Sequence, residues 1–314
     1  MTSEVENLIW AEAYRPKTID ECILPTETKK MLKEVAKASV NIPNMLFYGP
    51  AGTGKTSACR AIANEIGADI LYINASLERD LDVIRTTVVS FSSSVSFSGG
   101  IKIVLMDEFD GMTLIQQNAL KGVIEEFTNA RFFFTSNHVN KIIDPIKSRC
   151  VNLNFKIDAK DKPKLASNFF KRVVSILNEK NIKFEEKVVA QLVTKYFPDF
   201  RRTLNELQRY AIGGVIDAGI LADSGSESFK DLFAAMKDKD FSLVRKWVAI
   251  NKDIDSQVLF RDLYDNGSDM FEPSCLPNLI LILADYSYKA THSFDSEILV
   301  SAAMTEIMMS CKFK

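Results

Sequence analysis

Residues 49–56, Gly-Pro-Ala-Gly-Thr-Gly-Lys-Thr, decide the fold of this chain. They fit the phosphate-loop pattern, in which a glycine-rich loop ends in a lysine and a hydroxyl residue. An apolar run over 45–48 precedes the loop, and a stretch that predicts a helix over 54–66 follows it. Because backbone N–H groups and a helix start converge on such a loop, the segment predicts a site for nucleotide phosphates.

Two residues of this loop carry specific roles in the pattern. Lys55 can reach the β- and γ-phosphates, and the Thr56 hydroxyl can ligate magnesium. The alternative is a glycine turn that binds nothing. The order strand, glycine loop, helix favours the phosphate site over that alternative.

A second motif, which is acidic, lies fifty residues further along the chain. The apolar run 103–106 predicts a buried central strand, and it ends in Asp107 and Glu108. Asp107 is expected to hold magnesium directly or through water, and Glu108 to orient or deprotonate the water that attacks the γ-phosphate. An ordinary acidic turn after a strand is the alternative, and the phosphate loop upstream disfavours it.

Strands and helices alternate up to about residue 155. This alternation predicts an α/β fold with a parallel sheet that helices cover on both faces. The expected strands lie near 45–48, 70–73, 102–106, 131–135 and 151–155, and the expected helices near 26–38, 54–66, 80–92 and 113–127.

From residue 158 onward the strand signal vanishes and helical periodicity takes over, with helices expected over 161–179, 185–196 and 200–213. A further helical block over 228–314 carries breaker clusters at Gly267-Ser268 and at Pro273 and Pro277. The sequence therefore predicts three domains: an α/β domain over 1–156, a small helical domain over 157–224 and a second helical domain over 225–314.

The composition is that of an ordinary soluble globular protein. The chain has 314 residues, is 46% hydrophobic and 25% charged, and carries a net charge of −2. No apolar stretch is long enough to span a bilayer, and the N-terminus lacks the pattern of a secretory signal. The five cysteines are scattered and form no zinc motif, which favours reduced thiols. With a slightly acidic balance, any nucleic-acid binding must come from local basic positions.

Two further polar residues follow predicted strands. Asn137 ends the fourth strand, where it could position the attacking water, although it is also typical of a strand-end turn. Arg149 lies on a short connection at the edge of the domain. There it could enter a neighbouring subunit's nucleotide site and neutralise charge on the γ-phosphate. A surface salt bridge is the commoner fate of such an arginine.

Taken together, the motifs resemble those of clamp-loader ATPases. Residues 10–18, Trp-Ala-Glu-Ala-Tyr-Arg-Pro-Lys-Thr, resemble the N-terminal box of that family, and Ser148-Arg149-Cys150 resembles its Ser-Arg-Cys motif. Asp107-Glu108 is similar to its Walker B element. Residues 135–137 are similar to its sensor 1, and residues 200–208 to its sensor 2. The closest likeness is to the large (ATPase) subunit of T-even-type bacteriophage loaders, through residues 18–25, 197–201 and 214–221.

The resemblance implies an AAA+ module followed by a helical lid and a helical collar that oligomerises. It implies a five-subunit spiral around primer–template DNA, with four copies of this chain, one different small subunit and a sliding clamp as partners. ATP binding would open the clamp and bind DNA, and hydrolysis would release the loader. The expected location is the cytoplasm, that of the host bacterium if the protein is viral.

The resemblance also assigns residues, with ATP and Mg²⁺ as cofactors. The adenine would lie against the N-terminal segment, Arg201 would reach the phosphate from the lid, and Arg149 would act in trans. Asp107, Glu108, Lys55 and Asn137 would complete the catalytic set, with Thr56 and Asp107 on the metal. The full set expected to bind nucleotide is Ala11, Glu12, Ala13, Tyr14, Ile23, Gly52, Thr53, Gly54, Lys55, Thr56, Ser57 and Arg201.

Contacts with DNA and with the clamp are predicted more weakly. Residues 82–85, Asp-Val-Ile-Arg, resemble a helix start of the family that tracks template phosphates, which places Arg85 on DNA. Arg79 lies one turn earlier and could contribute or contact Glu108. A solvated helix face is the alternative for both arginines. An apolar stripe of Val88, Val89, Phe91 and Phe97 would suit a partner surface, but core packing is the favoured alternative for at least half of its members.

Two other functions remain open from the sequence. Another AAA+ motor, such as a branch-migration helicase or a helicase loader, would share the phosphate loop and the Asp-Glu pair. It should lack the N-terminal box and the Ser-Arg-Cys motif. A non-hydrolysing structural subunit of the loader should carry a degraded phosphate loop or lack Glu108, and both are intact here.

Overall fold

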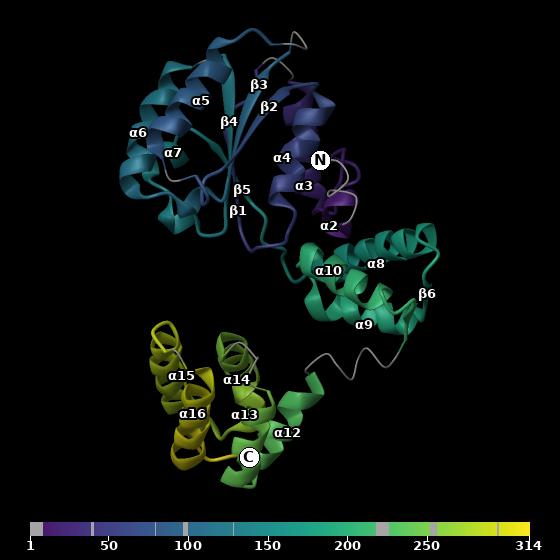
Figure 1. Cartoon of the computed structure of the whole chain (residues 1–314), viewed down its shortest axis with the longest axis vertical. Coiled ribbons are helices and arrows are strands. Elements are labelled where there is room, and N and C mark those ends of the chain that lie inside the picture. Colours follow the sequence, from purple (N-terminus) through teal and green to yellow (C-terminus); the bar gives the residue numbers. More distant parts are fainter. Residues whose placement is uncertain are drawn as a thin grey trace. The chain divides into compact units, whose positions relative to one another are not determined.

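The structure of the chain is a computed structural model with two compact units, Met1–Ile220 and Leu221–Lys314, which we describe separately. Figure 1 gives the path of the chain. The described residues are 9–38, 41–78, 80–96, 100–127, 129–217, 226–251, 256–293 and 295–314.

The first unit is built on a five-stranded parallel sheet with the strand order β2-β3-β4-β1-β5. Its strands lie where the sequence predicts them. Because all the strands run the same way, their carboxyl ends meet at one edge, where ligands of open α/β sheets bind. The strands are β1 (Met45–Tyr48), β2 (Asp69–Asn74), β3 (Lys102–Asp107), β4 (Ala130–Ser136) and β5 (Val151–Asn154).

Helices cover both faces of this sheet, as predicted (Figure 1). Met45 and Phe47 of β1 pack with α3 and α4 on one face, while Leu46 packs with the other group of helices on the opposite face. This alternation on a buried strand is what a sheet covered on both sides requires. The helices are α2 (Trp10–Ala13), α3 (Thr26–Lys37), α4 (Lys55–Glu65), α5 (Leu81–Ser93), α6 (Leu114–Glu126) and α7 (Asp144–Lys147), with 3₁₀ turns η1 (Phe109–Gly111) and η2 (Val139–Lys141).

Side-chain caps fix where several helices begin. The Asp80 carboxylate accepts hydrogen bonds from the amides of Asp82 and Val83 at the start of α5. Thr113 and Gln116 form a reciprocal capping box at the start of α6. Each cap satisfies amides that have no partner inside the helix, so these short polar residues set the helix boundaries.

The first unit continues into a helical lid of α8 (Lys162–Glu179), α9 (Glu186–Tyr196) and α10 (Phe200–Ala211). The expectation of no strand beyond residue 158 is wrong, because β6 (Lys183–Phe184) and β7 (Val215–Ile216) pair in parallel. Strands of two residues are too short to show a period in the sequence. Gly214, at φ +79°, turns the chain after α10 and brings β7 back to β6.

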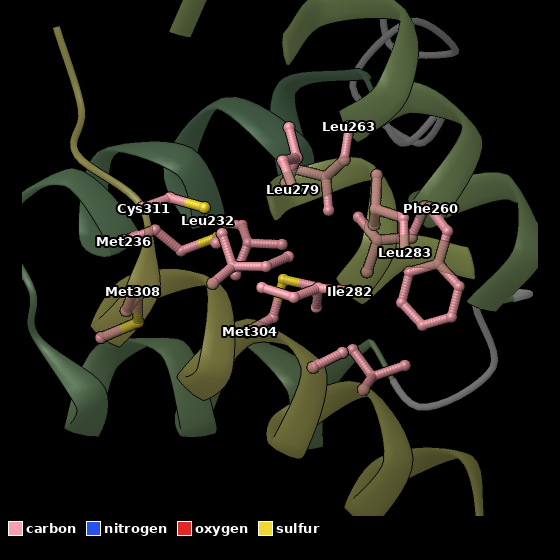
Figure 2. Packing of buried hydrophobic residues seen from close by; sticks show 14 of the residues in the cluster. Leu232, Met236, Phe260, Leu263, Leu279, Ile282, Leu283, Met304, Met308 and Cys311 are labelled. Atoms are coloured by element: carbon pink, nitrogen blue, oxygen red, sulfur yellow. The ribbon is translucent and has the colours of Figure 1, made fainter. Parts of the chain in front are cut away.

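In its described residues the second unit is built of helices, with one isolated antiparallel bridge between Phe271 and Phe313. Figure 2 shows its core, in which Leu232, Leu263, Leu279 and Met304 from four different helices meet. The break at Pro273 is confirmed, since one helix ends at Met270 and the next begins at Leu276, whereas Pro277 lies in the first turn of that next helix. The helices are α12 (Ser226–Lys237), α13 (Phe241–Ile250), α14 (Ser256–Met270), α15 (Leu276–Ala290) and α16 (Ser296–Ser310), with a 3₁₀ turn η3 (Pro273–Cys275).

The predicted break at Gly267-Ser268 is wrong, because α14 runs through both residues. Gly267 is buried, and a Cβ atom there would lie 2.9 Å from Leu279 Cδ2. The glycine therefore lets α14 and α15 approach each other, a packing role that the sequence alone does not distinguish from a helix break.

In the part of the chain that the structure describes, no helix has the length and apolarity that a membrane span requires.

Candidate nucleotide-binding site

The glycine loop between β1 and α4 has the backbone of a phosphate cradle. Gly49, Gly52 and Gly54 lie at φ +139°, +74° and +90°. Residues with a Cβ atom rarely adopt such angles, so the glycines are needed for the loop to curl around an anion. Because α4 begins at Lys55, the loop also places a helix N-terminus at the same point.

The lid docks onto this loop at Gly52. The Phe200 amide donates a hydrogen bond to the Gly52 carbonyl oxygen at 3.0 Å. A Cβ atom on Gly52 would lie 1.9 Å from Asp199 Oδ1, and the Asp199 carboxylate is held in place as the cap of α10. Gly52 therefore serves both the loop curvature and the contact with the lid.

Gly52→Ala is expected to weaken nucleotide binding by about tenfold or more, because strain at a positive φ alone costs on the order of 1–3 kcal/mol. Equilibrium titration with a fluorescent ATP analogue measures this affinity. Gly122→Ala is the matched control, since Gly122 lies in α6 and a Cβ atom there would have no neighbouring atom within 4 Å. Equal affinity in both variants would contradict a nucleotide held between loop and lid.

Lys55 points its ammonium group into the loop. Its Nζ donates to the carbonyl oxygens of Gly49 at 2.8 Å and Pro50 at 2.7 Å, and to Asn137 Oδ1 at 2.9 Å. Burial lowers the pKa of Lys55 to about 8, against the opposing effect of Asp107 and Asp110. Burial makes the charged form of Lys55 costly unless an anion lies nearby, and its ammonium group already points at oxygen atoms. Lys55 therefore fits a role in binding a phosphate group.

The carboxylate of Asp107 lies at the carboxyl end of β3. Its Oδ1 accepts from Thr56 Oγ1 at 2.8 Å and from Thr135 Oγ1, and its Oδ2 accepts from Tyr72 at 3.0 Å. Burial and the neighbouring Asp107 raise the pKa of Tyr72 to about 12. The Thr56 hydroxyl and the Asp107 carboxylate lie within hydrogen-bond distance of each other. Both carry the hard oxygen atoms that Mg²⁺ prefers as ligands, so these two residues fit this ion.

Glu108 follows directly and has an unusual backbone. It lies at φ +53°, in the left-handed region that non-glycine residues rarely occupy. Its amide donates to Thr135 Oγ1 at 3.0 Å, and its carboxylate accepts from Ser76 Oγ at 2.5 Å. Strained residues of this kind concentrate at functional sites. The turn separates the exposed Glu108 side chain from the buried Asp107 and leaves it at the edge of the cleft.

A single cleft with about 1140 Å³ of open space joins these groups to the N-terminal segment and the lid. It therefore brings together most of the residues that the sequence predicts for nucleotide binding and hydrolysis. Those lining it are Ala11, Tyr14, Ile23, Gly52, Thr53, Gly54, Lys55, Thr56, Ser57, Asp107, Glu108, Asn137 and Arg201.

Sequence reasoning missed the apolar wall of this cleft. Phe169 of α8 and Phe200 of α10 pack against each other with ring centroids 4.7 Å apart and ring planes tilted by 60°, and Ile176 and Leu204 extend the wall. Their spacing on predicted helices carried the signal, but it is the same spacing that core residues show. Arg15, Cys22, Leu24, Thr135 and Arg172 also line the cleft without having been predicted.

The N-terminal segment is tied to the lid across this cleft. The Trp10 amide donates to Gln208 Oε1 at 2.8 Å, and the Tyr14 hydroxyl donates to Glu179 Oε1 at 3.1 Å. The segment therefore forms one side of the cleft and holds the lid beside it.

Comparisons with known proteins agree with this geometry. Residues 45–157 match the model of the ATPase family associated with various cellular activities, and residues 161–222 match that of the sliding-clamp-loader large subunit, AAA+ ATPase lid domain. The sliding-clamp-loader large subunit of Escherichia phage RB69 is 38% identical over 246 residues, covering 76% of each chain. That of Enterobacteria phage T4 is 35% identical over 252 residues, covering 77% of each chain.

The chain belongs to the sliding-clamp-loader large subunit family.

More distant relatives extend over nearly the whole chain. Replication factor C subunit 5 of Homo sapiens is 30% identical over 326 residues, covering 98% of this chain and 94% of its own. Among solved structures, the Thermotoga maritima RuvB Holliday junction branch migration motor matches with a TM-score of 0.51 and 18% identity, covering 72% of this chain and 80% of that one. That likeness shows the AAA+ fold alone.

Two predicted residues of this clamp-loader subunit lie beside the cleft and not in its lining. Glu12 forms an ion pair with Arg15. Glu12 and Ala13 line a separate hollow that also contains Arg60 and Tyr72. Their contact with nucleotide stays a prediction.

Arg149 also lies away from the cleft. It is exposed between α7 and β5, where it forms an ion pair with Glu125 of α6 and donates to the Pro145 carbonyl oxygen at 2.7 Å. An arginine that acts on a neighbouring subunit must be accessible, so this position is compatible with the predicted role in trans. The ion pair alone would equally suit the salt-bridge alternative.

The two predicted DNA-contacting residues differ in what the structure describes. Arg85 is exposed one turn into α5, while Arg79 lies outside the described residues. Of the apolar stripe, Val88 is fully buried and Phe91 packs against the same core, so core packing explains these two. Phe97 lies outside the described residues.

Proposed function

We propose that this chain is the DNA-dependent ATPase subunit of a loader that opens a sliding clamp and places it on primer–template DNA. The observation that carries the proposal is the convergence of Lys55, Asp107, Glu108, Asn137 and Arg201 on one cleft. Phosphate binding, metal binding and activation of water each have a residue in this cleft. The names of the phage relatives supply the biological context.

The residues divide the work of hydrolysis between them. The glycine loop and Lys55 hold the phosphates, and Thr56 and Asp107 hold Mg²⁺, which neutralises charge on the phosphate oxygens when it is bound. Glu108 accepts the proton of the attacking water, and Asn137 orients that water. Lys55 Nζ donates a hydrogen bond to Asn137 Oδ1 at 2.9 Å. The residue that orients the water and the residue that holds the phosphate would therefore be positioned relative to each other by this hydrogen bond.

The lid makes the cleft responsive to its ligand. Arg201 reaches the cleft from α10, and the same helix contacts the phosphate loop through Phe200 and Gly52. A nucleotide bound between loop and lid therefore favours one lid position, because only there does Arg201 meet the phosphates. In a ring of subunits, this shift in the position of the lid would alter the contacts with the neighbouring subunit, the clamp and the DNA.

The proposed assembly is a five-subunit spiral with four copies of this chain and one different small subunit. Arg149 of one copy would enter the next copy's nucleotide site, the sliding clamp would be held open in the ATP state, and hydrolysis would release the loader in the cytoplasm. The native mass of the complex after co-expression with the small subunit tests the copy number. A complex without four copies would contradict the stoichiometry.

DNA would be held through its phosphates by the start of α5 and by Arg85, with Arg79 as a second candidate. We expect Arg85→Ala to weaken stimulation of the ATPase on all templates alike and to lower the salt dependence by about one phosphate contact per engaged subunit. ATPase assays on several primed templates between low and moderate salt measure both quantities.

Lys30→Ala is the control for this prediction, because Lys30 is an exposed cation on α3, on the opposite face of the sheet. Stimulation by DNA that survives the Arg85 change intact would move the DNA site elsewhere. A loss that depends strongly on the template sequence would contradict binding through phosphates.

A branch-migration motor is the competing function, because solved structures that share the fold include RuvB. Steady-state ATPase separates the possibilities. A clamp loader is stimulated by primed DNA together with the clamp, a branch-migration motor by four-way junctions, and a non-hydrolysing structural subunit by neither. Stimulation by junctions alone would overturn the proposed function.

A further inference from the structure

Tyr72 lies on β2, one of the two edge strands of the sheet, and its hydroxyl contacts Asp107, which lines the cleft. In the register of β2 with β3, Tyr72 pairs with Leu105 and Asn74 pairs with Asp107. The Tyr72 hydroxyl donates to Asp107 Oδ2 at 3.0 Å. We infer that Tyr72 is a positioning residue that fixes the Asp107 carboxylate in the orientation that receives Mg²⁺. The inference rests on the proposed function, since it assumes the magnesium nucleotide in this cleft.

The two oxygens of Asp107 are held by different parts of the fold. Oδ1 accepts from Thr56 of α4 and Thr135 of β4. Within the described residues, Oδ2 accepts only from Tyr72. The two bonds to Oδ1 already resist rotation about the Cβ–Cγ bond. The bond from Tyr72 adds a third restraint, from β2, on the oxygen that Thr56 and Thr135 do not contact.

The count of acceptor positions points to the same role. A carboxylate has about four lone-pair positions. In this structure the hydroxyls of Thr56 and Thr135 take the positions on Oδ1, and Tyr72 takes one on Oδ2. The position that stays open for a cation or its bound water is therefore on the oxygen that Tyr72 orients.

The tyrosine ring is itself held in place. Tyr72 is 42% exposed, so packing alone does not fix it. The Arg60 guanidinium lies over the ring, 4.9 Å from its centroid. Arg60 is one helical turn after Thr56 on α4. One helix therefore supplies the hydroxyl on Oδ1 and the cation that steadies the group on Oδ2.

Partners that orient a metal ligand typically change metal affinity by about 10–100-fold when they are removed. Tyr72→Phe keeps the ring beneath Arg60 and removes only the hydroxyl. We expect the Mg²⁺ concentration that half-saturates binding of a fluorescent, non-hydrolysable ATP analogue to rise about tenfold. Affinity for the same analogue in EDTA should not change, because the glycine loop and Lys55 are intact.

Tyr48→Phe is the matched control, since Tyr48 lies on β1 and its hydroxyl makes no hydrogen bond to the described residues. It should leave the Mg²⁺ requirement unchanged. An equal loss with and without Mg²⁺ in Tyr72→Phe would show general damage to the site and overturn the inference. So would an unchanged Mg²⁺ requirement.

The wild-type titration separates this inference from the proposed function. In one outcome, Mg²⁺ strengthens nucleotide binding in the wild type while Tyr72→Phe keeps the same Mg²⁺ requirement. This pair of results overturns the role of Tyr72 and leaves the proposed function standing. A wild-type protein that binds no nucleotide overturns both.

Discussion

Glu108→Gln is expected to lower the steady-state turnover of ATP by about a hundredfold or more, the contribution of one general base. Nucleotide affinity should remain, because the phosphates are held by the glycine loop and Lys55. The amide keeps the size of the side chain and can still accept from Ser76, which now contacts the carboxylate at 2.5 Å. The substitution therefore removes the general base and does not disturb the conformation of the turn.

ATPase assays on the assembled complex and equilibrium nucleotide binding measure the two expectations. Glu126→Gln is the control, since Glu126 is an exposed carboxylate at the end of α6. Turnover that stays unchanged in Glu108→Gln would remove Glu108 from the catalytic set. A parallel loss of nucleotide affinity would indicate a binding role.

Arg149→Ala has the second large expected effect. Arginine fingers contribute about a thousandfold or more to the rate of phosphoryl transfer. We expect a loss of this order in the assembled loader and no comparable loss in the isolated subunit, because the finger would act on the next subunit's nucleotide. Mixing Arg149→Ala subunits with Lys55→Ala subunits should restore some activity at interfaces that pair an intact finger with an intact phosphate loop.

Glu125 provides the control for this prediction. It is the ion-pair partner of Arg149, so Glu125→Gln breaks the same salt bridge and leaves the arginine in place. If Arg149 served only that salt bridge, the two variants would lose the same activity. We expect Glu125→Gln to keep most of the turnover. Equal defects, or a defect of Arg149→Ala in monomers, would contradict the role in trans.

The parallel sheet could be predicted from the sequence because its central strands β1, β3 and β4 are buried on both faces, and the nucleotide motifs directly follow strands of this kind. The run before Gly49 and the run before Asp107 are both continuous and apolar, and both are strands of the sheet. The β6–β7 pair could not be predicted, because each strand has two residues. Gly267 was misjudged because a packing glycine and a helix break look alike in one sequence.

The cleft could be predicted only in part, for a related reason. Motif residues such as Lys55 and Asp107 can be recognised by their spacing. The hydroxyl of Tyr72 and the carboxylate of Asp107 are brought together by the pairing of β2 with β3, which no local pattern reveals. Phe169 and Phe200 meet across the lid and carry the periodicity of ordinary core residues.

The central claim is that ATP bound in this cleft drives the loading of a clamp onto primed DNA. Energy transfer between a labelled clamp and a labelled primer–template, recorded after mixing with the assembled loader, tests it most directly. We predict a signal that requires ATP and a primer end, and a closed clamp left on DNA only when Glu108 and Arg149 are intact. ATP turnover without any transfer of the clamp to DNA would contradict the account.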